Sequence, residues 1–382
     1  MDFGRLEDPE FVSFVSEVRA FLGAELDQHR LAGLIDRRDD FDPAFHRALG
    51  RRGWVMPEWP VAEGGAGLDR RHARALDLEF ARAAAPRLNL STTRTILPAI
   101  VEHAAPTTAA RIATEAASGA ACIAMGYSEP EGGSDIAAAR TSARRDGTDW
   151  VIHGQKVFTT GAHHCRYIFL LTRTAPDAPK HAGLTMFLVP TEATGVHVSA
   201  MHTLDERTNV VTFDGVRVPD TMRIGSENDG WAVLLGPLNR EHGLGATRHV
   251  VDAATRHSRR LAEALEAALA WAVTPADGTL PADEPEVRRV LAEVAVDLMA
   301  ASSTWGHTGR IASAEAYLGR VGDLCELVGA RTAATGHPWS EDPAGILEFH
   351  RRSSQVSTLY GGSVEVVRDV LAHELGLPRW NR

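Results

Sequence analysis

Cysteine is scarce in this sequence, and long hydrophobic runs are missing. The three cysteines, Cys122, Cys165 and Cys325, are odd in number and widely spaced. They exclude a disulfide framework and a zinc-binding pattern, and we expect buried thiols in a reducing compartment. No run of about 18 apolar residues occurs, so no membrane span is expected. The first residues lack an apolar segment behind a basic flank, which argues against a signal peptide and predicts a cytoplasmic protein.

An excess of positive charge is also absent. The chain has 40 basic and 50 acidic residues, for a net charge of −10. This balance argues against nucleic acid or an anionic membrane as a partner, although a local basic pocket for an anionic ligand remains open. With 44% hydrophobic and 24% charged residues, the composition is that of an ordinary globular protein. A length of 382 residues exceeds the usual range of one hydrophobic core and favours two or three domains.

The hydrophobic pattern divides the chain into three parts. Residues 1–118 have helical spacing, with Asp8 as a candidate cap and Pro9 in the first turn. Residues 119–228 contain short β-rich runs, and residues 229–382 return to long amphipathic helices. The predicted fold is therefore mainly α with a central β domain. It comprises an N-terminal helical domain, a small antiparallel β-barrel or sandwich, and a C-terminal four-helix bundle.

Individual elements follow from the same pattern. In the first part, helical signals continue over Phe45–Leu49 and Ala73–Ala84. Asp146-Gly147 and Asp214-Gly215 are typical of turns between strands. The predicted strands are Trp150–Ile152, Val157–Thr160, Tyr167–Leu171, Leu184–Val189, Val196–Ala200 and Val210–Phe213. The predicted C-terminal helices are Trp231–Val273, Glu286–Trp305, Arg310–Thr335, Pro343–Leu359 and Ser363–Leu375.

The stretch Met125–Asp135 follows a short apolar run, Ala121–Met125, that is predicted to be a buried strand. Proline at position 130 stops regular structure there. Gly132 and Gly133 can adopt backbone angles closed to other residues, which would let backbone N–H groups approach a ligand. On its own, such a stretch is more often a polar turn between two elements. It carries three hydroxyl side chains, Tyr127, Ser128 and Ser134.

A second stretch, Gly154–Ala162, changes this interpretation. It contains Phe158 followed by two threonines, the second of which is Thr160. Two hydroxyl-rich strand ends in one β domain can hold a flat heteroaromatic ring, because the aromatic side chain packs on it and hydroxyls meet its nitrogens and carbonyls. Either stretch alone is a weak signal.

Together with a C-terminal motif, the two stretches resemble the acyl-CoA dehydrogenase family. Ser128–Asp135 matches the family's Tyr/Thr-Glu-Pro-x-x-Gly-Ser-Asp motif. Gly154–Thr160 matches Gly-x-Lys-x-Trp-x-Thr, with phenylalanine where tryptophan is usual. Tyr360–Arg368 matches Tyr-x-Gly-Thr-x-x-x-x-Arg and resembles the bacterial Tyr-Gly-Gly-Thr type. The order helix, sheet, helix is similar to the family over nearly the full length.

The resemblance implies bound FAD and α,β-dehydrogenation of an acyl-CoA thioester, in which a base removes the α-proton and flavin N5 receives the β-hydride. Ser134 would lie at the flavin pyrophosphate or near the thioester tail, and Glu365 is expected to contribute to the grip on the adenine. The backbone N–H of Gly361 would polarise the thioester carbonyl. By motif position, the flavin contacts would be Met125, Tyr127, Ser128, Phe158 and Thr160.

The catalytic base is not at its commonest family position, because residue 361 is glycine where many members have glutamate. Other members carry the base on a C-terminal-domain helix just ahead of an arginine. The corresponding residue here is Glu241, followed by His242. A carboxylate suits this role because burial can raise its pKa toward neutrality. The competing interpretation of Glu241 is an ordinary solvated glutamate on a helix.

Three further readings stay open. The same fold could act on acyl groups bound to a carrier protein, or serve as a flavin monooxygenase of a biosynthetic pathway. A third is a non-catalytic partner subunit of a heteromeric acyl-CoA dehydrogenase. The chain lacks the Arg-x-x-Phe-Gly motif with which many relatives reach a neighbouring subunit's FAD. The expected electron acceptor is an electron-transfer flavoprotein or a similar protein. The chain is expected to form a homodimer or homotetramer, with a hetero-oligomer as the alternative. No metal is expected.

Overall fold

The structure is a computed structural model, and its residues form two compact units, Met1–Leu238 and Asn239–Arg382. The units are described one at a time. The described residues are 8–26, 41–83, 85–86, 90–204, 207–241, 253–275, 278–304, 306–329, 332, 342–359 and 363–378.

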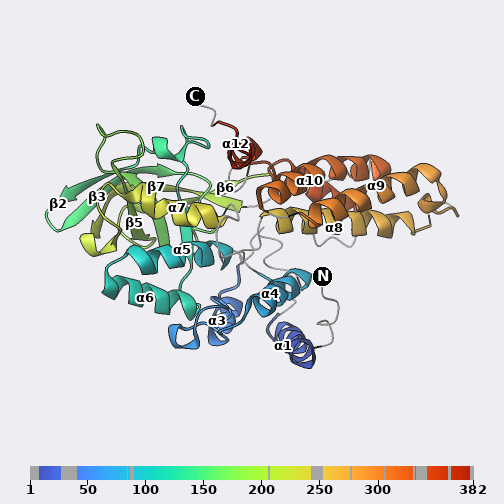
Figure 1. Cartoon of the computed structure of the whole chain (residues 1–382), viewed down its shortest axis with the longest axis horizontal. Helices are drawn as coiled ribbons and strands as arrows, with labels where there is room; N and C mark the ends of the chain where they lie inside the picture. Colours follow the sequence, from blue (N-terminus) through green and yellow to red (C-terminus); the bar gives the residue numbers. More distant parts are fainter. Residues whose placement is uncertain are drawn as a thin grey trace. The chain divides into compact units, whose positions relative to one another are not determined.

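The first unit begins with helices whose ends are set by local sequence. Asp8 accepts a hydrogen bond from Glu10 N at 3.1 Å and caps the first helix. Asp42 does the same for the next, accepting from Ala44 N at 2.8 Å. Both helices have proline in the first turn, where no N–H is needed. The helices are α1 (Pro9–Glu25), α3 (Pro43–Arg51), α4 (Arg70–Arg82), α5 (Leu90–His103) and α6 (Pro106–Ala117) (Figure 1).

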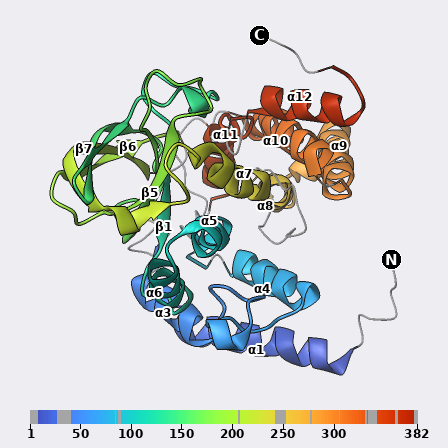
Figure 2. The same ribbon diagram turned by 60° about the vertical axis from the view of Figure 1, so that its left-hand side comes forward.

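An eight-stranded sheet follows, with the order β6-β7-β3-β2-β4-β5-β8 and with β1 beside β4. Most neighbours are antiparallel, but β1 and β2 each pair with β4 in parallel. The sheet curls round on itself, as expected for a small barrel or sandwich (Figure 2). Its strands are β1 (Ile123–Gly126), β2 (Ser142–Asp146), β3 (Asp149–Lys156), β4 (Tyr167–Arg173), β5 (Leu184–Pro190), β6 (Val196–His202), β7 (Arg207–Pro219) and β8 (Arg223–Ile224).

Two strand predictions need correction. Asp146-Gly147 is the predicted turn and joins β2 to β3, but Asp214-Gly215 lies inside β7. Two β7 residues there oppose one residue of β3, a bulge in which Gly215 has a φ of 63°. The predicted strand Val157–Thr160 is wrong, because β3 ends at Lys156 and the chain turns through Phe158 with a φ of 55°.

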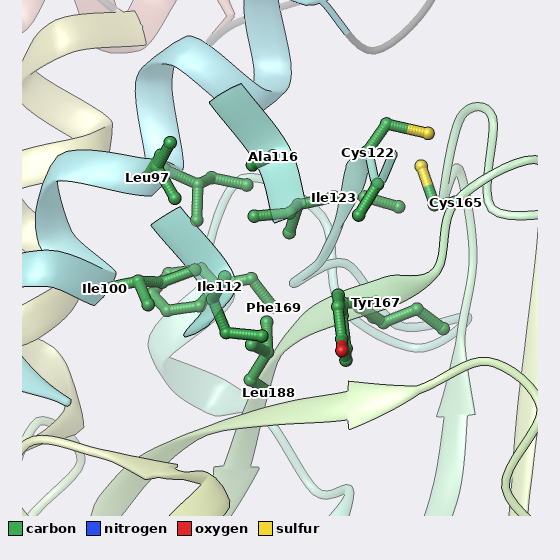
Figure 3. Close-up of a cluster of buried hydrophobic side chains, with 14 of the residues drawn as sticks. Leu97, Ile100, Ile112, Ala116, Cys122, Ile123, Cys165, Tyr167, Phe169 and Leu188 are labelled. Carbon is green, nitrogen blue, oxygen red and sulfur yellow. The ribbon is translucent and has the colours of Figure 1, made fainter. Parts of the chain in front are cut away.

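Helices α5 and α6 pack their apolar faces against β1 and its neighbour β4 (Figure 3). Ile100, Ile112, Ile123, Phe169 and Leu188 have no exposed surface. Burial of each such side chain stabilises the fold by roughly 1.5–3 kcal/mol. The same core cluster runs through the helices and the sheet, and it therefore holds β1, whose end opens the Met125–Asp135 stretch, against α5.

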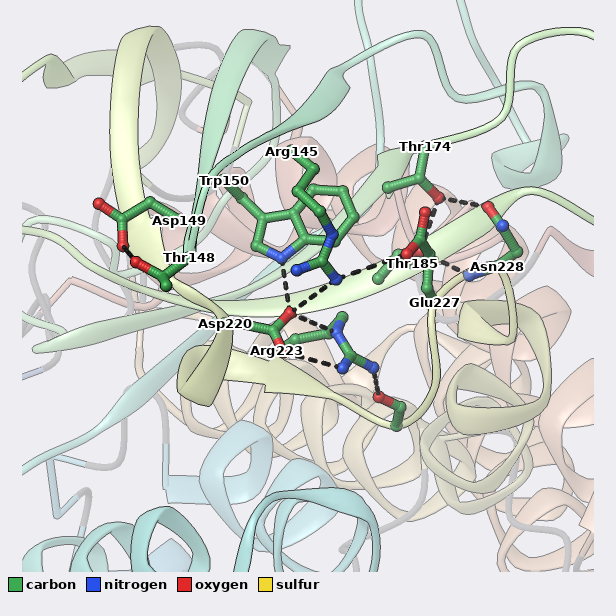
Figure 4. Close-up of polar contacts among 11 residues, drawn as sticks. Arg145, Thr148, Asp149, Trp150, Thr174, Thr185, Asp220, Arg223, Glu227 and Asn228 are labelled. Atoms are coloured by element: carbon green, nitrogen blue, oxygen red, sulfur yellow. Dashed lines mark hydrogen bonds and ion pairs between the residues drawn. The ribbon is translucent and has the colours of Figure 1, made fainter.

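A polar cluster joins β3 to the segment before β8 (Figure 4). The Asp220 carboxylate accepts hydrogen bonds from Trp150 Nε1 at 2.7 Å and from Arg223 Nε at 2.9 Å. The bond from Arg223 is the largest influence that lowers the pKa of Asp220. Arg145 stacks over the Trp150 ring, 4.5 Å from its centroid, and completes this cluster on the sheet.

Helix α7 (Gly230–Glu241) follows the sheet, and the second unit is helical. The predicted helix Trp231–Val273 corresponds to α7 and α8, while residues 242–252 lie outside the described part of the chain. The other four predicted helices are confirmed with shifted ends. The helices are α8 (Ala253–Ala272), α9 (Pro285–Ser302), α10 (Gly306–Val328), α11 (Pro343–Ser354) and α12 (Val364–Glu374). No helix among the described residues is long and apolar enough to cross a membrane.

The core of the second unit contains a polar pair between α10 and α11. The Tyr317 hydroxyl lies 2.9 Å from His350 Nδ1, and both side chains are buried. Burial is the largest influence on His350 and lowers its pKa to about 3, with Arg260 and Arg259 acting in the same direction. Glu263 lies 3.8 Å from His350 Nε2. The imidazole is therefore neutral in the folded protein at pH 7.

We predict that His350 makes the protein acid-sensitive. Its pKa is about 3 in the fold and about 6.5 in the unfolded chain. The unfolded state therefore binds the proton first, and stability that is fully present above pH 6.5 is lost as the pH falls toward 3. Between pH 7 and pH 5 this loss should be roughly 2 kcal/mol.

Urea unfolding of the full chain at both pH values, followed by circular dichroism, measures the effect. His350→Asn should show a smaller difference between the two pH values than the unchanged protein, whereas the exposed His197→Asn should not. An unaltered pH difference in His350→Asn would contradict the prediction.

Candidate functional site

The structure brings the two motif stretches of the β domain side by side. One follows the end of β1 and the other follows the end of β3. The backbone N–H of Val157 donates to the Ser128 carbonyl at 3.0 Å. Lys156 Nζ donates to the Tyr127 carbonyl at 3.1 Å. Residues almost thirty positions apart in the sequence thus form one continuous loop surface.

A buried ion pair joins the two stretches. Lys156 Nζ lies 2.7 Å from Glu129 Oε1, and the Lys156 side chain has no exposed surface. The Glu129 carboxylate also accepts hydrogen bonds from the backbone N–H groups of Arg140 and Thr141, at 2.7 and 2.8 Å. The lysine and the two backbone groups together give three hydrogen bonds to a carboxylate that is only 10% exposed. Removal of either charge would leave the other buried and uncompensated.

Both members of this pair are charged at pH 7. Burial alone would raise the pKa of Glu129, but the Lys156 charge and the hydrogen bonds hold it below its ordinary value. Burial is the larger influence on the lysine and lowers the pKa of Lys156 to about 8, against the opposing effect of Glu129. Both residues lie within the two sequence motifs, which by themselves predict no role for either of them.

Glycine is required at position 154 for a steric reason. Its φ is 148°, and a Cβ there would lie 2.6 Å from Thr141 Oγ1. This close approach places Thr141 where its N–H reaches Glu129. Gly132 and Gly133 differ from the prediction, since neither has a positive φ. A Cβ on Gly133 would meet nothing within 4 Å, so the backbone there borders open space.

Phe158 is held in an unusual conformation. It has a φ of 55° and its side chain is 62% exposed. Buried Asn209 on β7 fixes the next residue, because Thr159 N donates to Asn209 O at 3.0 Å and Asn209 Nδ2 donates to Thr159 O at 2.9 Å. A strained backbone that presents a large aromatic ring outward is typical of a ligand site. No sequence signal identifies Asn209, because it lies fifty residues away on another strand.

The remaining predicted contacts differ in exposure. Thr160 is half-buried, and its Oγ1 lies 3.0 Å from Thr208 Oγ1. The Tyr127 ring is buried and packs edge-on against Phe169, 6.2 Å between centroids. Met125 and Ser128 are half-buried, whereas Ser134 is exposed beside Asp135, which pairs with Lys180. An exposed aromatic ring next to hydroxyls fits a flat heteroaromatic ligand such as the flavin of FAD.

Three predicted residues lie elsewhere in the chain. Glu241 is the last residue of α7, but its side chain is outside the described part of the structure, as is Gly361. Glu365 is exposed in the first turn of α12, which Ser363 caps. The backbone N–H of Glu365 and the Ser363 hydroxyl lower the pKa of Glu365. The roles of all three residues stay predictions.

Comparison with known proteins identifies the class. The N-terminal domain of acyl-CoA dehydrogenases matches residues 8–120, and the middle domain matches residues 124–216. The chain belongs to the acyl-CoA dehydrogenase family, which uses FAD, and it is an acyl-CoA dehydrogenase. This confirms the predicted family and the predicted order of a helical domain, a β domain and C-terminal helices.

Individual relatives resemble the chain along nearly its whole length. Acyl-CoA dehydrogenase FadE29 of Mycobacterium tuberculosis is 32% identical over 365 residues, which cover 90% of this chain and 91% of that protein. A solved structure described as Tcur3481-Tcur3483 steroid ACAD has a TM-score of 0.82 at 28% identity, covering 98% of this chain and 99% of that chain. The ChsE4-ChsE5 complex from Mycobacterium tuberculosis has a TM-score of 0.82 at 26% identity, with 97% and 98% covered.

We predict that the buried ion pair is necessary for both stability and cofactor retention. Lys156→Met leaves the Glu129 carboxylate buried without its cation and should lower the free energy of unfolding by roughly 3–5 kcal/mol. The two loops should separate, and the purified protein should lose bound FAD. Thermal unfolding and the ratio of FAD to protein measure these effects.

An exposed ion pair near the same loop provides the control. Lys180→Met removes the partner of Asp135, and both of those side chains are about half exposed. Its effect on stability should be below about 1 kcal/mol. If Lys156→Met kept both its stability and its FAD, the proposed function of the pair would be wrong.

Proposed function

We propose that this acyl-CoA dehydrogenase carries out FAD-dependent α,β-dehydrogenation of an acyl-CoA thioester to the 2-enoyl thioester. The observation that carries the proposal is the pair of motif loops joined by Lys156 and Glu129, with Phe158 held outward beside Thr160. Met125, Tyr127, Ser128, Phe158 and Thr160 contact the flavin in this proposal. Ser134 lies at its pyrophosphate or near the thioester tail, and Glu365 contributes to the grip on the adenine.

The bound flavin supplies N5 as the acceptor of the β-hydride. The chain's own residues perform the proton chemistry. The backbone N–H of Gly361 donates to the thioester carbonyl oxygen and stabilises the negative charge that develops there. This lowers the pKa of the α-proton, which the Glu241 carboxylate then takes. Phe158 packs on the ring system, and the Thr160 hydroxyl offers a hydrogen bond to it.

The proposed substrate class is a bulky acyl group. Gly361 removes a side chain next to the reacting carbons, where many family members carry glutamate, and so leaves room for a branched or ring-bearing acyl chain. The name of the structural relative Tcur3481-Tcur3483 steroid ACAD supports a ring-bearing group. A panel of straight-chain, branched and ring-bearing thioesters that is screened for flavin bleaching distinguishes these substrates.

The base assignment predicts a specific defect. Glu241→Gln should keep its FAD and fold but lose anaerobic bleaching of the flavin absorbance on addition of the thioester. A positioned base contributes roughly 10²–10⁴-fold to the rate, so the bleaching rate should fall by about that factor. Glu266→Gln, an exposed glutamate on α8, is the matched control. Full activity in Glu241→Gln would rule out this residue as the base.

A second candidate is a subunit that works with a related chain. Two structural relatives carry paired names, Tcur3481-Tcur3483 and the ChsE4-ChsE5 complex. This chain also lacks the Arg-x-x-Phe-Gly motif. We predict that co-expression with a second acyl-CoA dehydrogenase chain yields a complex of larger mass with more FAD per chain than this chain alone. Size-exclusion chromatography with light scattering and flavin absorbance measures both, and full FAD in a homo-oligomer would contradict it.

The same fold leaves two other chemistries to be tested. Oxygen uptake driven by reduced flavin, without thioester dehydrogenation, would favour a monooxygenase. Activity with an acyl carrier protein but not with the matching acyl-CoA would favour a carrier-bound substrate. The electron acceptor in the proposed dehydrogenation is an electron-transfer flavoprotein or a similar protein.

A further inference from the structure

A buried hydroxyl lies directly behind Thr160. Thr208 on β7 is 2% exposed, and its Oγ1 lies 3.0 Å from Thr160 Oγ1. Among the described residues, this is the one hydrogen bond of the Thr208 side chain, and Thr160 likewise has no second side-chain partner there. The Thr160 hydroxyl therefore makes one hydrogen bond within the protein, to Thr208, and can make a second one to a ligand.

The direction of this hydrogen bond follows from burial. Each hydroxyl has one proton to donate and two lone pairs that accept. The proton of the buried Thr208 hydroxyl has one described acceptor, the Thr160 oxygen, and a buried donor without an acceptor is unfavourable. The 3.0 Å contact by itself allows either hydroxyl to donate, and burial favours Thr208 as the donor and Thr160 as the acceptor. The proton of Thr160 then points away from β7 and is available to a ligand on the opposite side of the hydroxyl.

The neighbouring residue on β7 fixes the loop that carries Thr160. Asn209 forms backbone and side-chain hydrogen bonds with Thr159, at 3.0 and 2.9 Å, and both residues are fully buried. The adjacent residues Thr208 and Asn209 thus set both the position of the loop and the orientation of its hydroxyl. β7 is held at this point by its register with β6, in which Thr208 pairs with Met201.

We propose that Thr208 is a positioning residue that makes the Thr160 hydroxyl a hydrogen-bond donor toward the bound flavin. This inference rests on the proposed contact between Thr160 and the flavin. Oxidised flavin has a lone pair at N5, which would accept from Thr160 where that atom faces the hydroxyl. Reduced flavin carries a hydrogen at N5, which would have to share the Thr160 oxygen with the Thr208 donor, while the Thr160 proton would lose its flavin acceptor. Thr208 therefore favours the oxidised cofactor and lowers its reduction potential.

The experiment measures the reduction potential of the flavin in the FAD-loaded protein, by anaerobic equilibration with a reference dye. Valine has the shape of threonine without the hydroxyl, so Thr208→Val should weaken the preference of the site for oxidised flavin. At a fixed ambient potential, the ratio of reduced to oxidised flavin should rise about two- to tenfold, the range for one hydrogen bond. Thr208→Ser keeps the hydroxyl and should restore the original ratio. Thr208→Ala is a second variant without the hydroxyl, should valine impair folding.

Two further variants complete the design. Thr212→Val is the matched control on the same strand, because its hydroxyl is hydrogen-bonded to Gln155 and does not contact Thr160, and it should leave the ratio unchanged. The double variant Thr160→Val with Thr208→Val should match Thr160→Val alone, since Thr208 acts through Thr160. A serine variant that behaves like the valine variant, or a double variant with additive effects, would overturn the inference.

The Thr160→Val variant distinguishes an error about Thr208 from an error about the proposed flavin contact. If Thr160→Val shifts the ratio and both Thr208→Val and Thr208→Ala do not, the flavin contact stands and the positioning role of Thr208 is wrong. If Thr160→Val leaves the ratio unchanged in protein that retains FAD, Thr160 does not contact the flavin ring. The proposed contact is then wrong, and the positioning role is wrong with it.

Discussion

The ion pair between Lys156 and Glu129 is the constraint on which the candidate site depends. A lysine without exposed surface is stable only where its charge is paired and hydrogen-bonded, and this requirement keeps the two loops in contact. The carboxylate receives two backbone N–H groups as well as the lysine, so Glu129 is also joined to the residues that lead into β2. Met125, Ser128 and Phe158 have defined positions because both strand ends are joined in this way.

A second support comes from β7. Asn209 and Thr208 face the loop after β3 and hold it from behind, which allows Phe158 to keep a backbone conformation that few non-glycine residues adopt. Hydrogen bonds to β7 therefore support the loop surface from within the β domain. A rigid surface loses little conformational entropy on binding, which suits a site that orients a cofactor for hydride transfer.

Much of the fold could be predicted because its signals are local. Proline after Asp8 indicates a helix start, and apolar periodicity indicates most helices and strands. The errors came from patterns with two structural outcomes. Asp214-Gly215 has the chemistry of a hairpin turn, but the same pair also suits a bulge inside a continuous strand. Val157–Thr160 is rich in β-favouring residues. In the structure it lies outside the sheet, between the Lys156–Glu129 ion pair and the hydrogen bonds from Asn209 to Thr159.

The sequence by itself determined the family, the order of the helical and β segments, and the motif residues expected at a flavin. Those conclusions need only residue types at fixed spacing. The tertiary structure alone decided that Lys156 is buried against Glu129, that Gly154 is needed to pass Thr141, and that Asn209 and Thr208 support the cofactor loop. The physical reason is that these contacts join residues 13 to 50 positions apart, and their pairing depends on strand register and on the curl of the sheet, which local patterns do not encode.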